Sequence, residues 1–144
     1  MLIAANWKMN LGKSEIDEFS KILQSNEFHD SLDICIFPPS VYINYLNTRI
    51  KNLPISIGAQ NCYHEFSGAF TGEVSPTSLK DIGCKYVLVG HSERRVNNNE
   101  SNLYVQKCTS AAIKSKLIPI VCVGETLKDR ESGTALEFIV KQLI

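Results

Sequence analysis

Three polar segments of the sequence carry residue types suited to anion binding and proton transfer, and each directly follows a short apolar run. They are Asn6-Trp7-Lys8, His91-Ser92-Glu93-Arg94-Arg95 and Gly124-Glu125-Thr126. A lysine ammonium can hold an anionic substrate as a point charge, and a glutamate can act as a general base. In parallel α/β folds, functional residues gather at the carboxyl ends of strands, so these segments are the candidate site.

His91 offers the most specific chemistry of the three segments. It precedes a polar turn that we expect to be helical, and the positive end of a helix dipole disfavours imidazolium. A neutral imidazole can donate an N–H to a carbonyl oxygen that gains negative charge. A structural histidine bonded to backbone is an equal alternative here. Lys8 by itself is more simply an exposed lysine, and Glu93 is either a base or an ion partner of Lys8 or Arg94.

These segments need a framework, and the chain alternates apolar runs with helical patterns. Strands are predicted at residues 2–5, 32–37, 55–59, 86–90 and 118–123. The first helix has a capping-box pattern at Ser14–Asp17, and the third is bounded by Ser75-Pro76 and Gly83. The strands are continuous apolar runs, as in parallel sheets that are covered on both faces.

The alternation predicts an α/β fold, either an open doubly wound sheet or part of an eightfold barrel. Five units over 144 residues give about 29 residues each, and eight such units would match the roughly 250 residues of a (β/α)8 barrel. We therefore expect an incomplete (β/α)8 barrel of about five β-α units. Residues 1–144 would form the N-terminal part of a single barrel domain.

Composition narrows the classes of partner. Fifteen basic residues balance fifteen acidic ones, so no basic field attracts nucleic acid or anionic lipid. The five cysteines form no C-x-x-C pair and the three histidines are far apart, so we expect no metal site. An odd number of cysteines favours reduced thiols in a cytoplasmic protein. No apolar run approaches the roughly 20 residues that span a bilayer, and no signal peptide is evident.

Five blocks of the sequence, in order along the chain, resemble the triosephosphate isomerase family. They are residues 6–10 (NWKMN), 58–61 (GAQN), 68–73 (GAFTGE), 89–95 (VGHSERR) and 119–125 (PIVCVGE). The resemblance implies interconversion of dihydroxyacetone phosphate and glyceraldehyde 3-phosphate, a reaction of glycolysis and gluconeogenesis, without a metal or organic cofactor. Its mechanism, a glutamate base with a neutral histidine electrophile, is a standard worked case.

The resemblance also assigns roles to individual residues. It implies that His91 is the electrophile and Lys8 the electrostatic clamp on the substrate, with Asn6 beside it and Glu93 and Ser92 in support. It further implies a homodimer. The interface residues would be Met9, Gln60, Asn61 and Thr71.

Two departures from the family pattern affect these expectations. Val96-Asn97-Asn98-Asn99 stands where the family usually has an aromatic residue and a glycine. In the family, the catalytic base follows the sixth strand, and the phosphate-binding loops come later still. The sequence contains no segment that matches the base or these loops. We therefore expect a truncated or split isomerase, inactive alone and dependent on a complementing C-terminal chain. The alternatives are a non-catalytic remnant or assembly module and, disfavoured by the ordered blocks, an unrelated phosphate-binding barrel enzyme.

Overall fold

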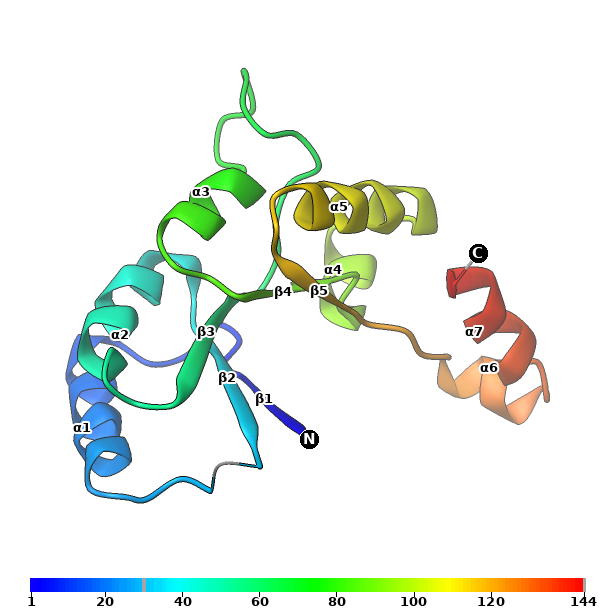
Figure 1. Ribbon diagram of the computed structural model, residues 1–144. Helices are drawn as coiled ribbons and strands as arrows, with labels where there is room; N and C mark the ends of the chain where they lie inside the picture. The colour runs from blue at the N-terminus through cyan, green and yellow to red at the C-terminus, as the bar shows by residue number, and fades with distance from the viewer. Residues whose placement is uncertain (30, 144) are drawn as a thin grey trace.

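The strands form one parallel sheet whose spatial order follows the chain. The computed structural model describes residues 1–29 and 31–143, and within them the sheet has the order β1-β2-β3-β4-β5. The strands are β1 (Leu2–Asn6), β2 (Asp33–Phe37), β3 (Ile55–Ala59), β4 (Tyr86–Val89) and β5 (Ile118–Val121). A doubly wound sheet reverses its order at a switch point, whereas a barrel adds each strand beside the last. The predicted incomplete barrel is confirmed, and the sheet is curled but open (Figure 1).

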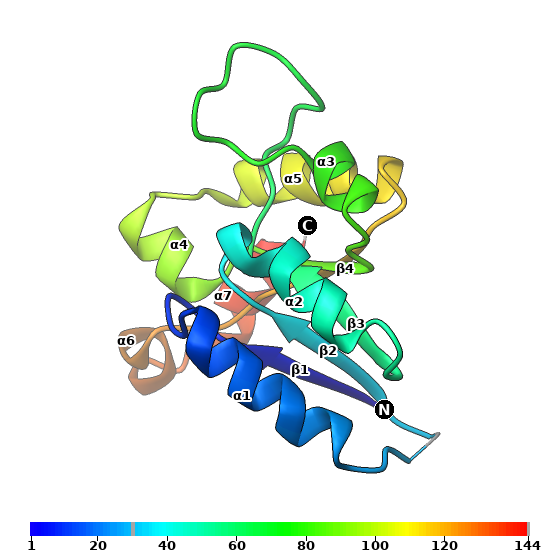
Figure 2. The same cartoon turned by 90° about the vertical axis from the view of Figure 1, so that its left-hand side faces the viewer.

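The helices lie mainly on the convex side of this sheet. They are α1 (Lys13–Gln24), the short 3-10 helix η1 (Ser40–Tyr42), α2 (Ile43–Ile50), α3 (Pro76–Asp81), α4 (Ser92–Asn97), α5 (Asn102–Lys114), α6 (Leu127–Glu131) and α7 (Ala135–Leu143). Figure 2 shows α1, α2, α3 and α5 along one side of the strands. The pair α6 and α7 lies apart from them, beyond the end of β5 (Figure 1).

Alternation along the strands produces two apolar layers. Ile36, Ile57 and Val87 face the helices and pack with Ile16 of α1 and Leu46 of α2. The neighbouring strand positions point to the concave face, because successive side chains alternate across a strand. There a second cluster forms from Cys35, Phe37, Tyr86 and Leu88, with Ile120 packed against it. The helix-covered layer therefore holds the fold together, and the concave layer is the start of a barrel interior.

One predicted helix start is wrong and another is confirmed. The first helix begins at Lys13, with Gly12 as its N-cap, so Ser14 already lies inside the helix. The Glu15 carboxylate accepts the Gly12 N–H at 2.7 Å, so the capping box spans Gly12–Glu15 instead of Ser14–Asp17. The third helix is as predicted, since Ser75 caps it and Gly83 ends it with a φ of 92°.

The fifth strand is shorter than the predicted 118–123, because its partner β4 ends first. Val89 pairs with Val121, and the last bond of this ladder runs from the Cys122 N–H to the Val89 carbonyl oxygen at 2.9 Å. Gln142 of α7 then brackets Gly124, accepting its N–H and donating to its carbonyl oxygen, both at 2.9 Å. The chain thus turns away from the sheet into α6 and α7. Within the described residues, no helix is long and apolar enough to cross a membrane.

Candidate active site

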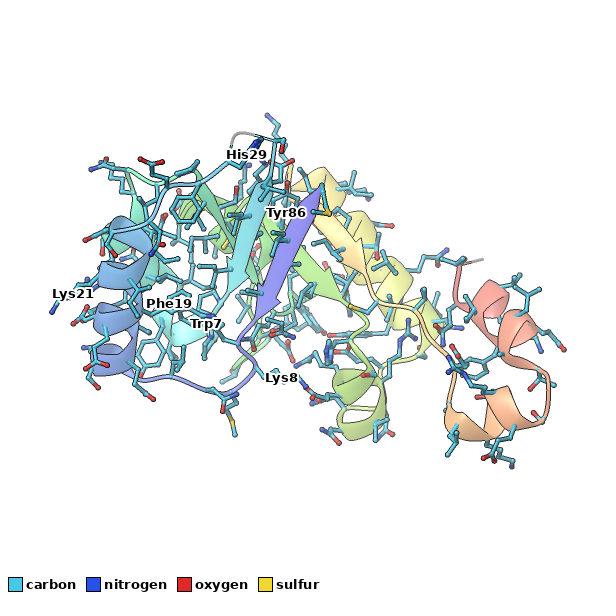
Figure 3. The ribbon with its side chains drawn as sticks, turned by 90° about the horizontal axis from the view of Figure 1, so that it is seen from below. Trp7, Lys8, Phe19, Lys21, His29 and Tyr86 are labelled. Atoms are coloured by element: carbon cyan, nitrogen blue, oxygen red, sulfur yellow. The ribbon has the colours of Figure 1, made fainter. Side chains whose placement is uncertain are left out.

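The loop after β1 holds Lys8 in a strained backbone conformation at the carboxyl end of the sheet. Lys8 has a φ of 55°, in the left-handed region that few non-glycine residues adopt. Asn6 stabilises this turn, because its Oδ1 accepts the Lys8 N–H at 2.9 Å. Trp7 anchors the other side of the loop by packing edge-on against Phe19 of α1, with ring centroids 5.4 Å apart (Figure 3). Strain of this kind is typical of functional sites and costs about 1–3 kcal/mol.

Gln60, directly after β3, forms a hydrogen bond to the same loop. Its Nε2 donates to the Lys8 carbonyl oxygen at 2.7 Å and to the Phe37 carbonyl oxygen at 2.9 Å. One amide therefore joins the loop after β1 to the end of β2. The side chain of Gln60 therefore points toward the site. Its interface role, which the resemblance implies, stays a prediction.

His91 is the N-cap of α4, and its hydrogen bond defines its tautomer. The ring Nδ1 accepts the Glu93 backbone N–H at 3.2 Å. An acceptor nitrogen carries no proton, so a neutral His91 bears its proton on Nε2. The imidazole then presents an N–H donor on the side away from the helix. This is the form that an electrophile for a carbonyl oxygen requires.

Glu93 joins Lys8 to His91. The Lys8 ammonium donates to Oε1 of Glu93 at 2.7 Å, with the two side chains 53% and 49% exposed, and Oε2 lies 3.6 Å from His91 Nδ1. The hydrogen bond from Lys8, with a smaller contribution from its charge, lowers the pKa of the Glu93 carboxyl. A lowered pKa makes a carboxylate a weaker proton acceptor, so the contact with Lys8 favours the ion-partner interpretation of Glu93 over the general-base one.

The third polar segment stands apart from this group. Glu125 forms an ion pair with Arg130 of α6, and a hydrogen bond from its own backbone and this arginine lower the pKa of its carboxyl. The structure therefore joins two of the three predicted segments, through Lys8, Glu93 and His91. Ser92 begins α4 beside them and is exposed.

The residues predicted to form a dimer interface are spread over two loops. Met9, beside Lys8, is 93% exposed. Asn61 is partly buried at the base of the segment 60–75, which extends away from the sheet between β3 and α3, and Thr71 is exposed within that segment (Figure 1). Two phenylalanines of the same segment, Phe66 and Phe70, are also exposed. The interface itself stays a prediction.

The other groups of the chain that could carry chemistry are metal ligands and thiols. Within residues 1–29 and 31–143, no three histidine, cysteine or acidic side chains lie close enough together to hold a metal ion. Burial raises the pKa of Cys35, Cys62 and Cys84 to about 12, so these thiols stay protonated and are not nucleophiles. Sequence reasoning missed Gln60, which donates to the Lys8 carbonyl oxygen, and Arg95, which donates to the Gly90 carbonyl oxygen. No periodicity or motif signals a side chain that bonds to backbone in this way.

Comparison with known proteins shows the family of the chain. The model of the family described as triosephosphate isomerase matches residues 1–144. The chain is 43% identical to the triosephosphate isomerase of Finegoldia magna over 142 residues, 40% identical to that of Pseudomonas putida and 45% identical to that of Endomicrobium trichonymphae over 143. Each match covers 99% of this chain and 57% of the relative. The chain thus spans little more than half the length of these curated relatives, and it belongs to the triosephosphate isomerase family.

Proposed function

We propose that this chain supplies the electrophile and the anion clamp of an aldose–ketose isomerase that interconverts dihydroxyacetone phosphate and glyceraldehyde 3-phosphate. The observation that carries the proposal is the arrangement of Lys8, Glu93 and His91 at the carboxyl end of β1 and β4. It combines a cation held in a strained loop with an imidazole whose Nδ1 is already occupied. A phosphorylated carbonyl substrate needs both.

Each side chain has one task in this proposal. The Lys8 ammonium has three N–H donors, so it can keep its bond to Glu93 and also hold a substrate oxyanion. His91 donates its Nε2–H to the carbonyl oxygen while a base removes a proton from the adjacent carbon, and thereby stabilises the enediolate. Asn6 keeps Lys8 in place through the backbone bond described above.

The proposal also includes a partner for proton abstraction. A general base must lie within hydrogen-bond reach of the substrate carbon. Glu93 is committed to Lys8 and Glu125 to Arg130, and the curated relatives are longer than the matched region. We therefore assign the base and the phosphate-binding loops to three further strand–helix units, supplied by a complementing C-terminal chain. The family resemblance favours assembly as a homodimer and a cytoplasmic location.

An assay with purified polypeptides tests the proposal. The 144-residue chain alone should show no turnover of glyceraldehyde 3-phosphate in a coupled assay. Mixing it with the part of a curated relative that its match leaves uncovered should produce activity. In that mixture Lys8→Ala should lower kcat/KM by about 10²–10³, as for loss of one preorganised electrostatic contact.

Lys21→Ala is the matched control for the loss of a positive charge. Lys21 lies on α1 and points away from the sheet (Figure 3), so its removal should leave kcat/KM unchanged. Turnover by the lone chain that His91→Ala abolishes would refute the need for a complementing chain. Full activity in Lys8→Ala would remove Lys8 from the site. A stable mixture without turnover would favour a non-catalytic assembly module.

A further inference from the structure

Arg95 contacts three separate elements around His91, and none of these contacts has a role in the chemistry described so far. Its Nε donates to the Gly90 carbonyl oxygen at 2.7 Å, its Nη1 to Asn102 Oδ1 at 2.7 Å and its Nη2 to the Cys122 carbonyl oxygen at 3.3 Å. These acceptors lie at the end of β4, at the start of α5 and just after β5. One guanidinium therefore ties the end of the histidine's own strand to its neighbours.

The bond to Gly90 bears directly on His91. The Gly90 carbonyl belongs to the peptide group that joins Gly90 to His91, and this group is planar. Fixing its oxygen therefore fixes the direction in which the His91 backbone leaves the strand. Gly90 has a φ of 69°, and a Cβ at this position would lie 2.8 Å from Arg95 Nη2 and 2.9 Å from the Val105 side chain. A side chain at position 90 would therefore collide with the Arg95 guanidinium, and glycine leaves room for it.

We propose that Arg95 is a positioning residue for His91. By holding the Gly90–His91 peptide, it keeps Nδ1 of His91 on the Glu93 N–H and so keeps the ring proton on Nε2. The meaning of this orientation for catalysis depends on the proposed isomerase function. The orientation itself depends only on the contacts of Arg95, and it can be measured without turnover.

An arginine is required for this role, and the next residue provides a matched control. A guanidinium has five N–H donors in a planar fork, whereas a lysine ammonium is a point charge on a flexible stem. Arg95→Lys keeps the charge and loses the fork. Arg94, on the same helix, donates from its Nε to Glu100 Oε1 at 2.6 Å. Arg94→Lys is the same chemical change at a side chain that makes no bond to Gly90.

The first test is the imidazole NMR spectrum of the 144-residue chain with 15N-labelled histidine, which reports the tautomer. We expect wild-type His91 to be mainly the Nε2–H form. Arg95→Lys should change the tautomer ratio at His91 by about fivefold, as for loss of one hydrogen bond. Arg94→Lys should not change it. His29 is an internal reference, because its Nδ1 also accepts a backbone N–H, from Ser31 at 3.2 Å, near the opposite end of the sheet (Figure 3).

A folded Arg95→Lys chain with an unchanged His91 spectrum would overturn the proposal. Should that variant fail to fold, Asn102→Ala takes its place, since it removes one acceptor of Arg95 and leaves the arginine. A smaller shift in the same direction supports the proposal, and an unchanged His91 signal in a folded Asn102→Ala chain overturns it.

The second test uses the mixture with the complementing polypeptide. Arg95→Lys should lower kcat by about tenfold with KM changed less than about twofold, because Lys8 still binds the substrate while the electrophile is misdirected. An equal loss in Arg94→Lys would overturn the specific role of Arg95. If the wild-type mixture is inactive while the NMR shift is present, the isomerase function fails and the positioning of His91 by Arg95 is upheld.

Discussion

Helices α2 and α7 have similar lengths and an apolar face each, yet only one of them is packed. In α2, Ile43, Leu46 and Ile50 are buried against β2 and β3 and their neighbours. In α7, Ala135–Leu143, the described residues include no buried side chain, and Leu136 and Leu143 are exposed. The second unit has a strand on each side of its own strand. The fifth unit, in the described chain, has β4 on one side alone.

The difference teaches that an amphipathic helix does not create its own packing surface. A helix in a (β/α) fold covers the groove between its strand and the next, so it needs both strands to bury its apolar face. The fifth unit has no such groove among the described residues. Instead, hydrogen bonds hold α7, between Gln142 and Gly124 and from Asn102 to the Lys141 carbonyl oxygen. Polar bonds of this kind contribute about 1 kcal/mol each, whereas a buried leucine contributes several times more on truncation.

The largest expected effect comes from truncating leucine in each helix. Leu46 is 0% exposed and Leu136 is 76% exposed. Leu46→Ala should lower the free energy of unfolding by about 3 kcal/mol through the cavity it leaves, and Leu136→Ala by less than about 0.5 kcal/mol. Urea unfolding followed by circular dichroism measures both. Equal losses would show that α7 packs in solution as α2 does.

The next effect concerns the sheet edges. Ile3 of β1 and Val121 of β5 are partly exposed on strands that have one neighbour each within the described residues. Open edges favour pairing between chains, so the purified chain should associate or aggregate with rising concentration. Val121→Lys should weaken this association by about tenfold, because a charged edge residue opposes strand addition.

Ile113→Lys is the control for this change, since Ile113 is exposed on α5 and lies outside the sheet. It should leave self-association unaltered. Size-exclusion chromatography over a range of loading concentrations distinguishes the two variants. A wild-type chain that stays monomeric, with one sharp thermal transition, would contradict the idea that the edges are open.

The smallest effect is on acid stability. Hydrogen bonds from Arg49 and Tyr45 lower the pKa of Asp17 and join α1 to α2, whereas Lys141 lowers the pKa of Glu137 within α7 itself. A carboxyl whose pKa is lower in the folded than in the unfolded state stabilises the fold at neutral pH. This stabilisation is lost as pH falls from the ordinary carboxyl pKa through the lowered one. Asp17→Asn should lower Tm by no more than about 4 °C at pH 7, with the difference vanishing at low pH. Glu137→Gln should lower Tm at pH 7 by less than Asp17→Asn does, because its ion pair with Lys141 lies within α7 and joins no two elements.

All five strands and the order of the units were predicted from the sequence, because continuous apolar runs such as 86–89 and stop signals such as Gly83 act locally. The sequence also identified Lys8, Glu93 and His91 as candidates for one site. The bonds from Gln60 were beyond prediction, since they join it to carbonyl groups 52 and 23 positions away. The strained φ of Lys8 was missed because no sequence pattern signals it at a lysine. The separate placement of α7 was missed for the same reason, as helical periodicity does not report what the helix packs against.

The consecutive strand order has a consequence for how the chain folds during synthesis. Each strand from β2 to β5 pairs with the strand made just before it, and no pairing in the described chain waits for a later one. Such pairings close short loops, which keeps their entropic cost low. A nascent chain can therefore dock each unit on the previous one as it leaves the ribosome. We expect protease-resistant intermediates to grow from the N-terminus in steps of one unit.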